Sequence, residues 1–191
     1  MIEDLLPNKT GIEAGAGKLL ISEPFLQDKS FHRSVIFLCH HDAKESVGYI
    51  VNKMSGQYLS EFVPDIHIPV PVYFGGPVGL DTLHMVHTIP HLIGGDKVQE
   101  DLYWGGDMES AIENIKLGKL HTQNCKFFIG YSGWGEGQLQ AELDMKAWLV
   151  AHCNPALIFA EEGNELWHTA IAQLGKRFNP LLFMPDRPEL N

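Results

Sequence analysis

The segment GYSGWGEGQL, residues 130–139, combines four glycines with a serine, a tyrosine, a tryptophan and a glutamate. A serine nucleophile on a strand-to-helix elbow needs the pattern G-x-S-x-G, but here Trp134 stands where the last glycine should be. The dinucleotide pattern G-x-G-x-x-G and the phosphate-binding G-K-[ST] are also missing, because the glycines alternate and a glutamine follows them. Alternate glycines let a backbone bend sharply or approach another surface closely. We therefore expect a joint between a strand and a helix.

The same segment is also a candidate wall of a binding cleft. The free N–H groups of a helix that starts near Gln138 would point toward the glycines and would favour an anion or a carbonyl group there. In the alternative interpretation, Trp134 fills the core and the glycines only permit the bend. The sequence leaves both interpretations open, with the structural one preferred.

Ten histidines raise the question of a metal site. His40 and His41 are adjacent, and His84 and His87 lie in a strand-like segment, so each pair points to opposite faces. The chain has no H-E-x-x-H pattern and no clustered cysteines and histidines. We expect neither a metal ion nor a cofactor.

A polar segment, residues 22–35, joins two apolar strands. Asp28 and Arg33 are placed to pair across the turn, with Phe31 packed beneath them. Arg33 also stands next to Ser34 at a strand start, where an arginine is able to bind an anion. We favour the structural role, in which Arg33 pairs with Asp28, over anion binding by Arg33.

The charge balance limits the partners. Against 24 acidic residues stand 14 lysines and arginines, which gives a net charge of −10 without any basic run. Nucleic-acid binding and adsorption to anionic membranes both depend on clustered positive charge. Direct contact with nucleic acid is therefore disfavoured, and we expect no membrane association.

Length and composition indicate one globular domain, residues 17–191, preceded by a loosely tied arm, residues 1–16. No apolar run is long enough to span a bilayer, and the acidic N-terminus lacks the layout of a signal peptide, so we expect a cytoplasmic protein. The three cysteines are far apart in apolar segments and are expected to be reduced core residues.

Strand-like segments outnumber helical ones. Short runs rich in β-branched and aromatic residues, typical of strands, occupy residues 18–22, 34–40, 47–52, 70–74, 82–89, 98–104, 125–131 and 155–159. Pro69 and Pro71, just before and within the fourth of these runs, predict a sheet edge or a strand entry. About three helices are expected, at residues 107–118 with Asp107 as N-cap, 138–152, and 164–174 with Asn164 as cap; a helical turn is possible near residues 57–63. Because strands precede most helices, we predict an α+β fold with a bent, largely antiparallel sheet.

Four segments in this order, KLLISEPFLQDKSFHRSVIFLCHH, GYIVNK, YFGGPV and GYSGWGEGQLQAEL, resemble the YqgE/AlgH family of bacterial proteins from about residue 17 to residue 175. The resemblance marks these residues: Pro24, Asp28, Phe31, Arg33, Ser34, Asn52, Gly75, Gly76, Pro77, Gly130, Gly133, Trp134, Gly135, Gly137, Gln138, Leu139 and Glu142. It departs at Met54 and Ser55, where many members have a proline, and at Gln140, where many have a glutamate. It implies a bifurcated sheet that forms a pseudo-barrel and a role in regulating transcription, and it assigns no reaction.

Two hypotheses follow. In the first, a non-enzymatic regulatory or interaction protein uses a surface formed by residues 22–35, 75–77 and 133–138, on which Arg33 and Trp134 are exposed. In the second, a small anion or a nucleotide is held by Arg33 and the N-terminus of the helix at Gln138, with Ser132 or Glu142 as a polar participant. The candidate surface also includes Tyr131. The partner could be a protein or a small anionic ligand, and the aromatic content leaves a homo-oligomer open.

Overall fold

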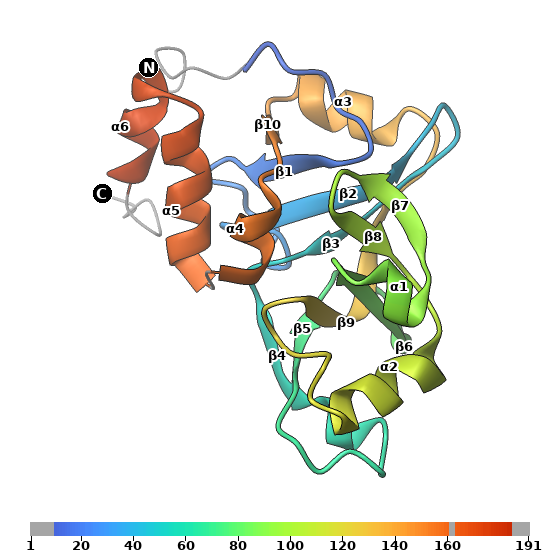
Figure 1. Cartoon of the computed structure of the whole chain (residues 1–191). Coiled ribbons are helices and arrows are strands. Elements are labelled where there is room, and N and C mark those ends of the chain that lie inside the picture. The colour runs from blue at the N-terminus through green and yellow to red at the C-terminus, as the bar shows by residue number, and fades with distance from the viewer. Residues whose placement is uncertain (1–9, 161–162, 185–191) are drawn as a thin grey trace.

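The computed structural model describes residues 10–160 and 163–184. One ten-stranded, curled sheet forms the centre, with helices packed on it (Figure 1). The strands are β1 (Lys18–Ser22), β2 (Val35–His41), β3 (Ser46–Ile50), β4 (Met54–Tyr58), β5 (Pro71–Phe74), β6 (Val78–His87), β7 (Asp96–Gln99), β8 (Leu102–Trp104), β9 (Cys125–Trp134) and β10 (Trp148–His152). The helices are α1 (Pro90–Ile93), α2 (Met108–Lys116), α3 (Gln138–Asp144), α4 (Pro155–Ala160), α5 (Gly163–Gln173) and α6 (Asn179–Leu182), with short 3₁₀ turns η2 (Leu59–Glu61) and η3 (Lys176–Phe178).

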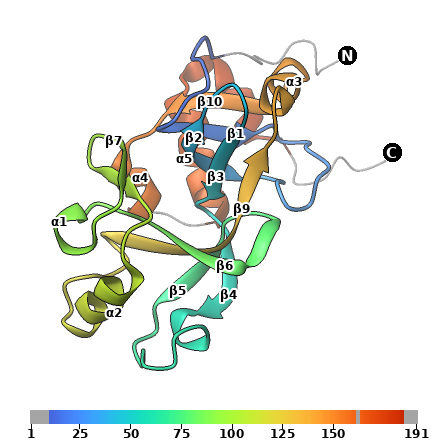
Figure 2. The same cartoon turned by 90° about the vertical axis from the view of Figure 1, so that its right-hand side faces the viewer.

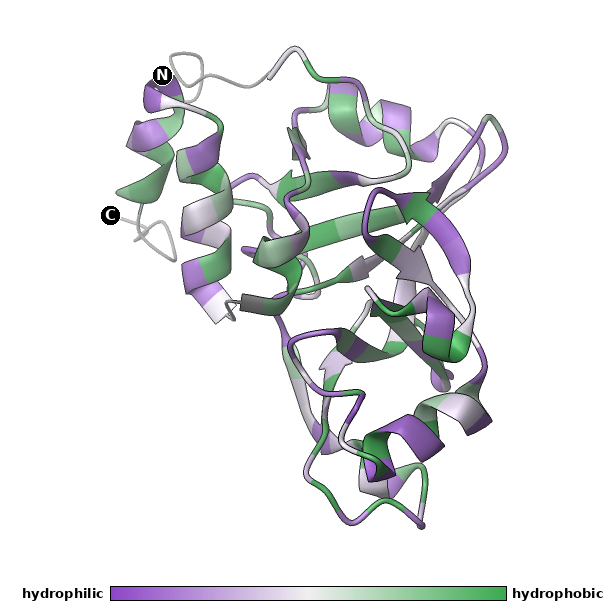
Figure 3. Cartoon of the chain, viewed as in Figure 1, coloured by the Kyte–Doolittle hydropathy of each residue, from purple (hydrophilic) through white to green (hydrophobic). Residues whose placement is uncertain are grey.

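Strands β10, β1, β2 and β3 form one antiparallel half of the sheet. Helix α5 covers one face of this half, where Trp167 and Ile171 join the main core. Helix α3 covers the other face through Leu139. Because both faces are covered, successive residues along β1 and β2 are buried, and these strands are mostly hydrophobic in Figure 3.

Strand β9 joins this half to the rest of the sheet. Its C-terminal end pairs with β3, while its N-terminal part lies between β5, which is parallel to it, and β6, which is antiparallel. Figure 2 shows β9 as a long, bent strand that runs from the lobe containing α2 toward α3. Gly130 marks the bend with a φ of 65°. This division confirms the predicted α+β fold with a bent, largely antiparallel and bifurcated sheet.

The lobe that contains α1 and α2 has its own core beneath these helices, built around Phe127, Ala111 and Ile115. Helix α2 begins where expected, because Asp107 accepts a hydrogen bond from the Ser110 backbone N–H at 2.7 Å.

Several predicted boundaries are wrong. The expected helix over residues 138–152 ends at Asp144, and Trp148–His152 forms the edge strand β10. Lys146 adopts a left-handed conformation with a φ of 65°, which stops the helix and turns the chain. Residues 155–159, expected as a strand, lie in helix α4, and α5 already includes Gly163, so Asn164 is not its cap.

Two further expectations also need correction. Residues 98–104 do not form one strand, because Asp101 (φ 62°) lies in a turn between β7 and β8. Strand β5 is not an edge, since it pairs with both β4 and β9. Pro71 does stand at its entry, so that part of the prediction is confirmed.

The cysteines are free, as expected: Cys39 and Cys125 are buried and Cys153 is half-buried. Burial raises the pKa of all three thiols, so they behave as neutral packing groups at pH 7. In the described part of the chain, no helix is long and apolar enough to cross a membrane.

Candidate binding cleft

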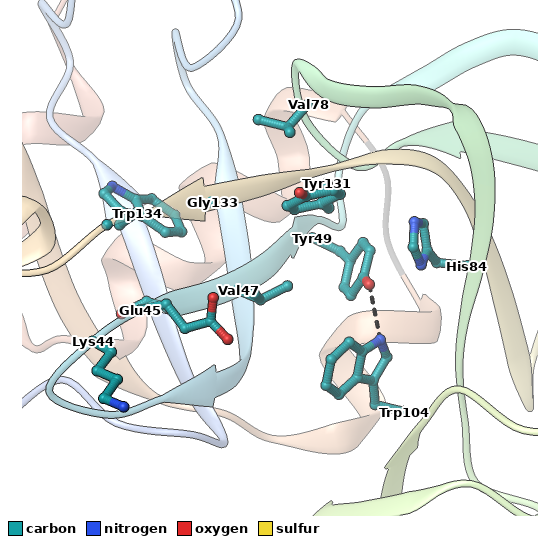
Figure 4. Close-up of a pocket in the computed structure, with 12 residues that line it drawn as sticks. Lys44, Glu45, Val47, Tyr49, Val78, His84, Trp104, Tyr131, Gly133 and Trp134 are labelled. Atoms are coloured by element: carbon teal, nitrogen blue, oxygen red, sulfur yellow. Dashed lines mark hydrogen bonds between the residues drawn. The ribbon is translucent and has the colours of Figure 1, made fainter.

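A cleft of about 470 Å³ opens beside the glycine-rich segment, where the end of β9 meets the start of β3 (Figure 4). Val47 of β3 and Gly133 of β9 are paired across the two strands and form its floor. Gly133 adds no side chain beside Val47, and the Tyr131 ring lies 3.1 Å from where a Cβ atom of residue 133 would stand. The aromatic side chains around this floor are Tyr49, His84, Trp104, Tyr131 and Trp134.

Four of these rings form a chain of contacts along one wall. Trp104 donates its indole N–H to the Tyr49 hydroxyl at 2.8 Å, and the two ring centroids are 6.3 Å apart. The Tyr49 ring lies 5.3 Å from His84, and His84 lies 5.9 Å from Tyr131. Burial raises the pKa of Tyr49, so its hydroxyl stays neutral. The four rings come from strands β3, β6, β8 and β9, so the curled sheet itself holds the wall in place.

His84 is neutral at pH 7, because partial burial lowers its pKa. Its Nε2 lies 2.8 Å from the Thr82 hydroxyl. His87, three residues along β6, is fully buried and stacks on Tyr103 with ring centroids 5.8 Å apart. In residues 10–160 and 163–184, no group of three or more histidine, cysteine or acidic side chains is placed to hold a metal ion.

The mouth of the cleft carries one charge of each sign, from Lys44 and Glu45 in the turn between β2 and β3. Asp42 fixes this turn by accepting hydrogen bonds from the backbone N–H groups of Lys44 and Glu45 at 2.8 and 2.9 Å. These hydrogen bonds lower the pKa of the Asp42 carboxyl group. In Figure 4 the Glu45 carboxylate points toward Val47, whereas the Lys44 ammonium group points away from the rings.

Glu142 connects several of the residues that the sequence singled out. Its Oε2 accepts hydrogen bonds from the indole N–H groups of Trp134 at 2.8 Å and Trp148 at 2.7 Å. Its Oε1 accepts one from the Gln138 side-chain amide N–H at 3.0 Å, and the Gln138 side-chain oxygen Oε1 accepts the Gly135 backbone N–H at 3.1 Å. This network fixes α3 against the end of β9, so these residues position the edge of the cleft.

The glycines before β6 permit a close contact between two backbones. A Cβ atom on Gly75 would overlap the Gly130 carbonyl oxygen, and one on Gly76 would overlap the Tyr131 backbone. Ser132 is fully buried, and its hydroxyl donates to the Gly75 carbonyl oxygen at 3.0 Å. Its hydroxyl is therefore committed to the scaffold and is closed to substrate.

Arg33 and Asn52 belong to a different cluster. Arg33 lies over the Trp167 ring at 5.0 Å and donates to the Met184 carbonyl oxygen at 2.7 Å. Asn52 accepts the Val35 backbone N–H at 2.8 Å and donates to the carbonyl oxygens of Arg33 and Gly163 at 2.9 and 3.0 Å. Arg33 precedes β2 while Lys44 and Glu45 follow it, so the cluster and the cleft lie at opposite ends of that strand.

Arg33 and Trp134 have exposed fractions of 5% and 4%, so the hypothesis of a surface that exposes both is wrong. Their burial agrees with the structural roles that the sequence favoured for them. Each side chain has hydrogen-bond or ring contacts inside the fold that account for its burial. An interaction surface built on these two side chains is therefore closed to a partner.

The remaining candidates take local roles. Asp28 accepts the Ser30 backbone N–H at 2.8 Å, and the Ser34 hydroxyl donates to the Phe31 carbonyl oxygen at 2.8 Å. Pro77 is exposed in the turn before β6, and Gly137 has a φ of 71° at the start of α3. Of the candidates from the sequence, Tyr131, Gly133, Trp134 and Gly135 line the cleft.

The sequence did not single out Tyr49, His84, Trp104 or Glu45 as site residues. A partial signal existed, since alternate residues of neighbouring strands share a face, as Val47 and Tyr49 do on β3. The pairing of β3 with β9 and of β6 with β8 is long-range, and no local pattern predicts it.

The comparison with known proteins agrees with these motifs. A family model described as AlgH-like matches residues 19–179. The chain belongs to the AlgH-like family. A UPF0301 protein of Cytophaga hutchinsonii is 36% identical over 178 residues, which cover 92% of this chain and 98% of that protein. A UPF0301 protein of Bacteroides thetaiotaomicron is 34% identical over 177 residues, covering 92% of this chain and 90% of that one.

Solved structures of other proteins show the same fold. The crystal structure of a Corynebacterium diphtheriae protein superposes with a TM-score of 0.74 at 21% identity, over 91% of this chain and 94% of that one. The solution structure of the AlgH protein from Pseudomonas aeruginosa gives a TM-score of 0.67 at 27% identity, over 89% and 94% of the two chains. The resemblance to the YqgE/AlgH family is thereby confirmed, and family membership assigns no ligand.

Proposed function

We propose that this protein is a non-enzymatic regulatory protein of the cytoplasm that binds a protein partner in the aromatic cleft. The observation that carries the proposal is the open floor at Gly133, surrounded by aromatic side chains from four strands. Concave sites lined by aromatic groups with a few polar groups at the mouth are typical of binding sites. Aromatic pockets also receive the anchor side chains that dominate many protein interfaces.

A selection experiment tests this proposal. A peptide display library is panned in parallel on the wild-type protein, on Gly133→Leu, which fills the floor, and on Gly15→Ala as a glycine replacement outside the cleft. Neither glycine has a positive φ, so both replacements keep an allowed backbone. We expect a recurring peptide sequence to be enriched on the wild type and on Gly15→Ala and lost on Gly133→Leu. Circular dichroism checks that each variant folds.

A second variant that blocks the cleft, here called a closing variant like Gly133→Leu, is used if Gly133→Leu fails to fold. Val78 lines the cleft and is 40% exposed, so Val78→Lys places a long, positively charged side chain at the site with little effect on the core. A peptide that binds both closing variants as well as the wild type would contradict the proposal.

Binding of a nucleotide or another small anion is the second candidate. The cleft volume of about 470 Å³ suits a small molecule, and Lys44 supplies a cation at its mouth. A thermal-shift screen with nucleotides and phosphorylated metabolites tests it, because ligand at about 100 times Kd adds roughly 2.7 kcal/mol to stability. A shift that Gly133→Leu abolishes would favour this candidate over a protein partner.

A further inference from the structure

The chemistry of the cleft indicates which kind of side chain it receives. Its accessible wall consists of ring faces from Trp104 and Tyr131 with neutral His84 between them. The indole N–H of Trp104 is already bonded to Tyr49, so this wall offers π-faces more than hydrogen-bond donors. Ring faces attract cations, and tryptophan does so most strongly.

The charges at the mouth of the cleft also favour a positively charged ligand. The Glu45 carboxylate points toward the floor of the cleft, and the Lys44 ammonium group points away from it (Figure 4). Glu136, which directly follows the lining residue Gly135, is exposed and adds a second negative charge beside the mouth. The whole chain carries a net charge of −10, which draws basic partners and repels acidic ones.

We propose that the cleft binds an arginine side chain of a basic protein partner, with the guanidinium group stacked on the Trp104 and Tyr131 rings and paired with the Glu45 carboxylate. This inference rests on the proposed function and specifies its ligand. Arginine fits better than lysine, because a guanidinium group is planar, stacks on aromatic faces and pairs with a carboxylate through two parallel hydrogen bonds. A phosphorylated or acidic segment would meet the Glu45 carboxylate and is disfavoured.

The test uses peptides that differ at one position. Acetylated and amidated pentapeptides Gly-Ser-X-Ser-Gly, with X as arginine, lysine, phenylalanine or glutamate, are titrated into the ¹⁵N-labelled full-length protein by NMR. We expect the arginine peptide to shift the Trp104 indole and Gly133 amide signals and to bind several-fold more tightly than the lysine peptide. The glutamate peptide should produce no measurable shift. Gly133→Leu should abolish these shifts.

Glu45→Gln tests the ion pair on an exposed residue whose replacement does not threaten folding. We expect it to weaken binding of the arginine peptide by about threefold and to reduce the salt dependence of binding, because an ion pair at an exposed rim is partly screened by solvent. Glu113→Gln on the exposed face of α2 is the matched control with the same change in net charge, and it should bind as the wild type does.

The outcomes separate this inference from the proposed function. If the phenylalanine peptide binds in a Gly133-dependent way and the arginine peptide does not, the cleft is a binding site but the cationic ligand is wrong. If no peptide produces Gly133-dependent shifts, the inference is overturned, and the library selection alone decides the proposed function. If N-acetylarginine amide binds as tightly as a twelve-residue peptide carrying arginine among basic residues, a small guanidinium compound replaces the protein partner and the inference is overturned.

Discussion

Trp134 and Glu142 are joined by a hydrogen bond of 2.8 Å between the indole N–H and the carboxylate Oε2. The Trp148 indole N–H reaches the same oxygen at 2.7 Å, and the rings of the two tryptophans meet edge to face at 6.1 Å. One carboxylate thus satisfies two buried indoles, one from β9 and one from β10. This arrangement explains why the glycine-rich segment needs a glutamate one turn into the following helix.

Replacing Glu142 should reveal how much stability this arrangement provides. Glu142→Ala leaves two largely buried N–H donors without their acceptor, and each unsatisfied donor costs about 1–3 kcal/mol. We expect the free energy of unfolding to fall by about 2–4 kcal/mol in urea denaturation. Gln140→Ala on the exposed face of the same helix is the control and should change it by less than about 0.5 kcal/mol. Equal stabilities of the two variants would contradict a structural role for the carboxylate.

Most strands up to β9 were predictable from local sequence, whereas β4, β10 and the helix boundaries after residue 137 were not. Leu139, Leu143, Ala147 and Val150 recur at helical spacing, so periodicity alone continues the helix to residue 152. The chain breaks at Lys146 because Trp148 must turn inward to reach Glu142 and pair with β1. These contacts of Trp148 are tertiary, so the local hydrophobic pattern does not predict where the helix ends.

The cleft was half predictable for a similar reason. The segment over residues 130–135 drew attention through its composition, and it does form one side of the cleft. Its opposite wall depends on Trp104, which reaches the site only because β8 pairs with β6 and β6 pairs with β9. The burial of Arg33 agrees with the structural role favoured for it, but its contact with Trp167 is long-range and no local pattern predicts it.

Asn52 should be sensitive to an isosteric change. Its amide nitrogen donates to the carbonyl oxygens of Arg33 and Gly163, and its carbonyl oxygen accepts from Val35. Asn52→Asp replaces the donor with an oxygen that faces two carbonyl oxygens in a buried site, so it should destabilise the fold at pH 7 more than Asn52→Ala does. Chemical denaturation of the two variants measures this order. The reverse order, with the aspartate variant the more stable, would contradict the assigned donor and acceptor roles.

His87 should make stability depend on pH. Burial lowers its pKa in the folded state, and its neutral ring is placed between the Gly105 carbonyl oxygen at 3.1 Å and the Ile89 N–H at 3.2 Å. As the pH falls through about 6.5, the unfolded chain takes up a proton that the folded one resists, so stability decreases. We expect the wild type to lose stability between pH 7.5 and pH 5.5 and His87→Gln to lose less.

His91→Gln is the control for that experiment, since His91 is exposed on α1 and its replacement should keep the wild-type difference between the two pH values. His84 has a lowered pKa as well, so a smaller dependence should persist in His87→Gln. A pH dependence of unfolding that is the same in His87→Gln and in the wild type would exclude His87 as its source.

Gly75 provides a test of the close contact between the β5–β6 connection and β9. Its φ is not in the left-handed region, so alanine is permitted there by the backbone, yet its Cβ would overlap the Gly130 carbonyl oxygen and crowd the Tyr49 ring. Gly75→Ala should therefore destabilise the protein by about 3 kcal/mol, at the upper end for overpacked sites, because a backbone oxygen yields less than a side chain. Gly15→Ala meets no atom within 4 Å and should be neutral or slightly stabilising. If urea denaturation gives the same unfolding free energy for both alanine variants, the two backbones do not pack this closely, and the curvature that holds Tyr49 in the cleft wall must have another origin.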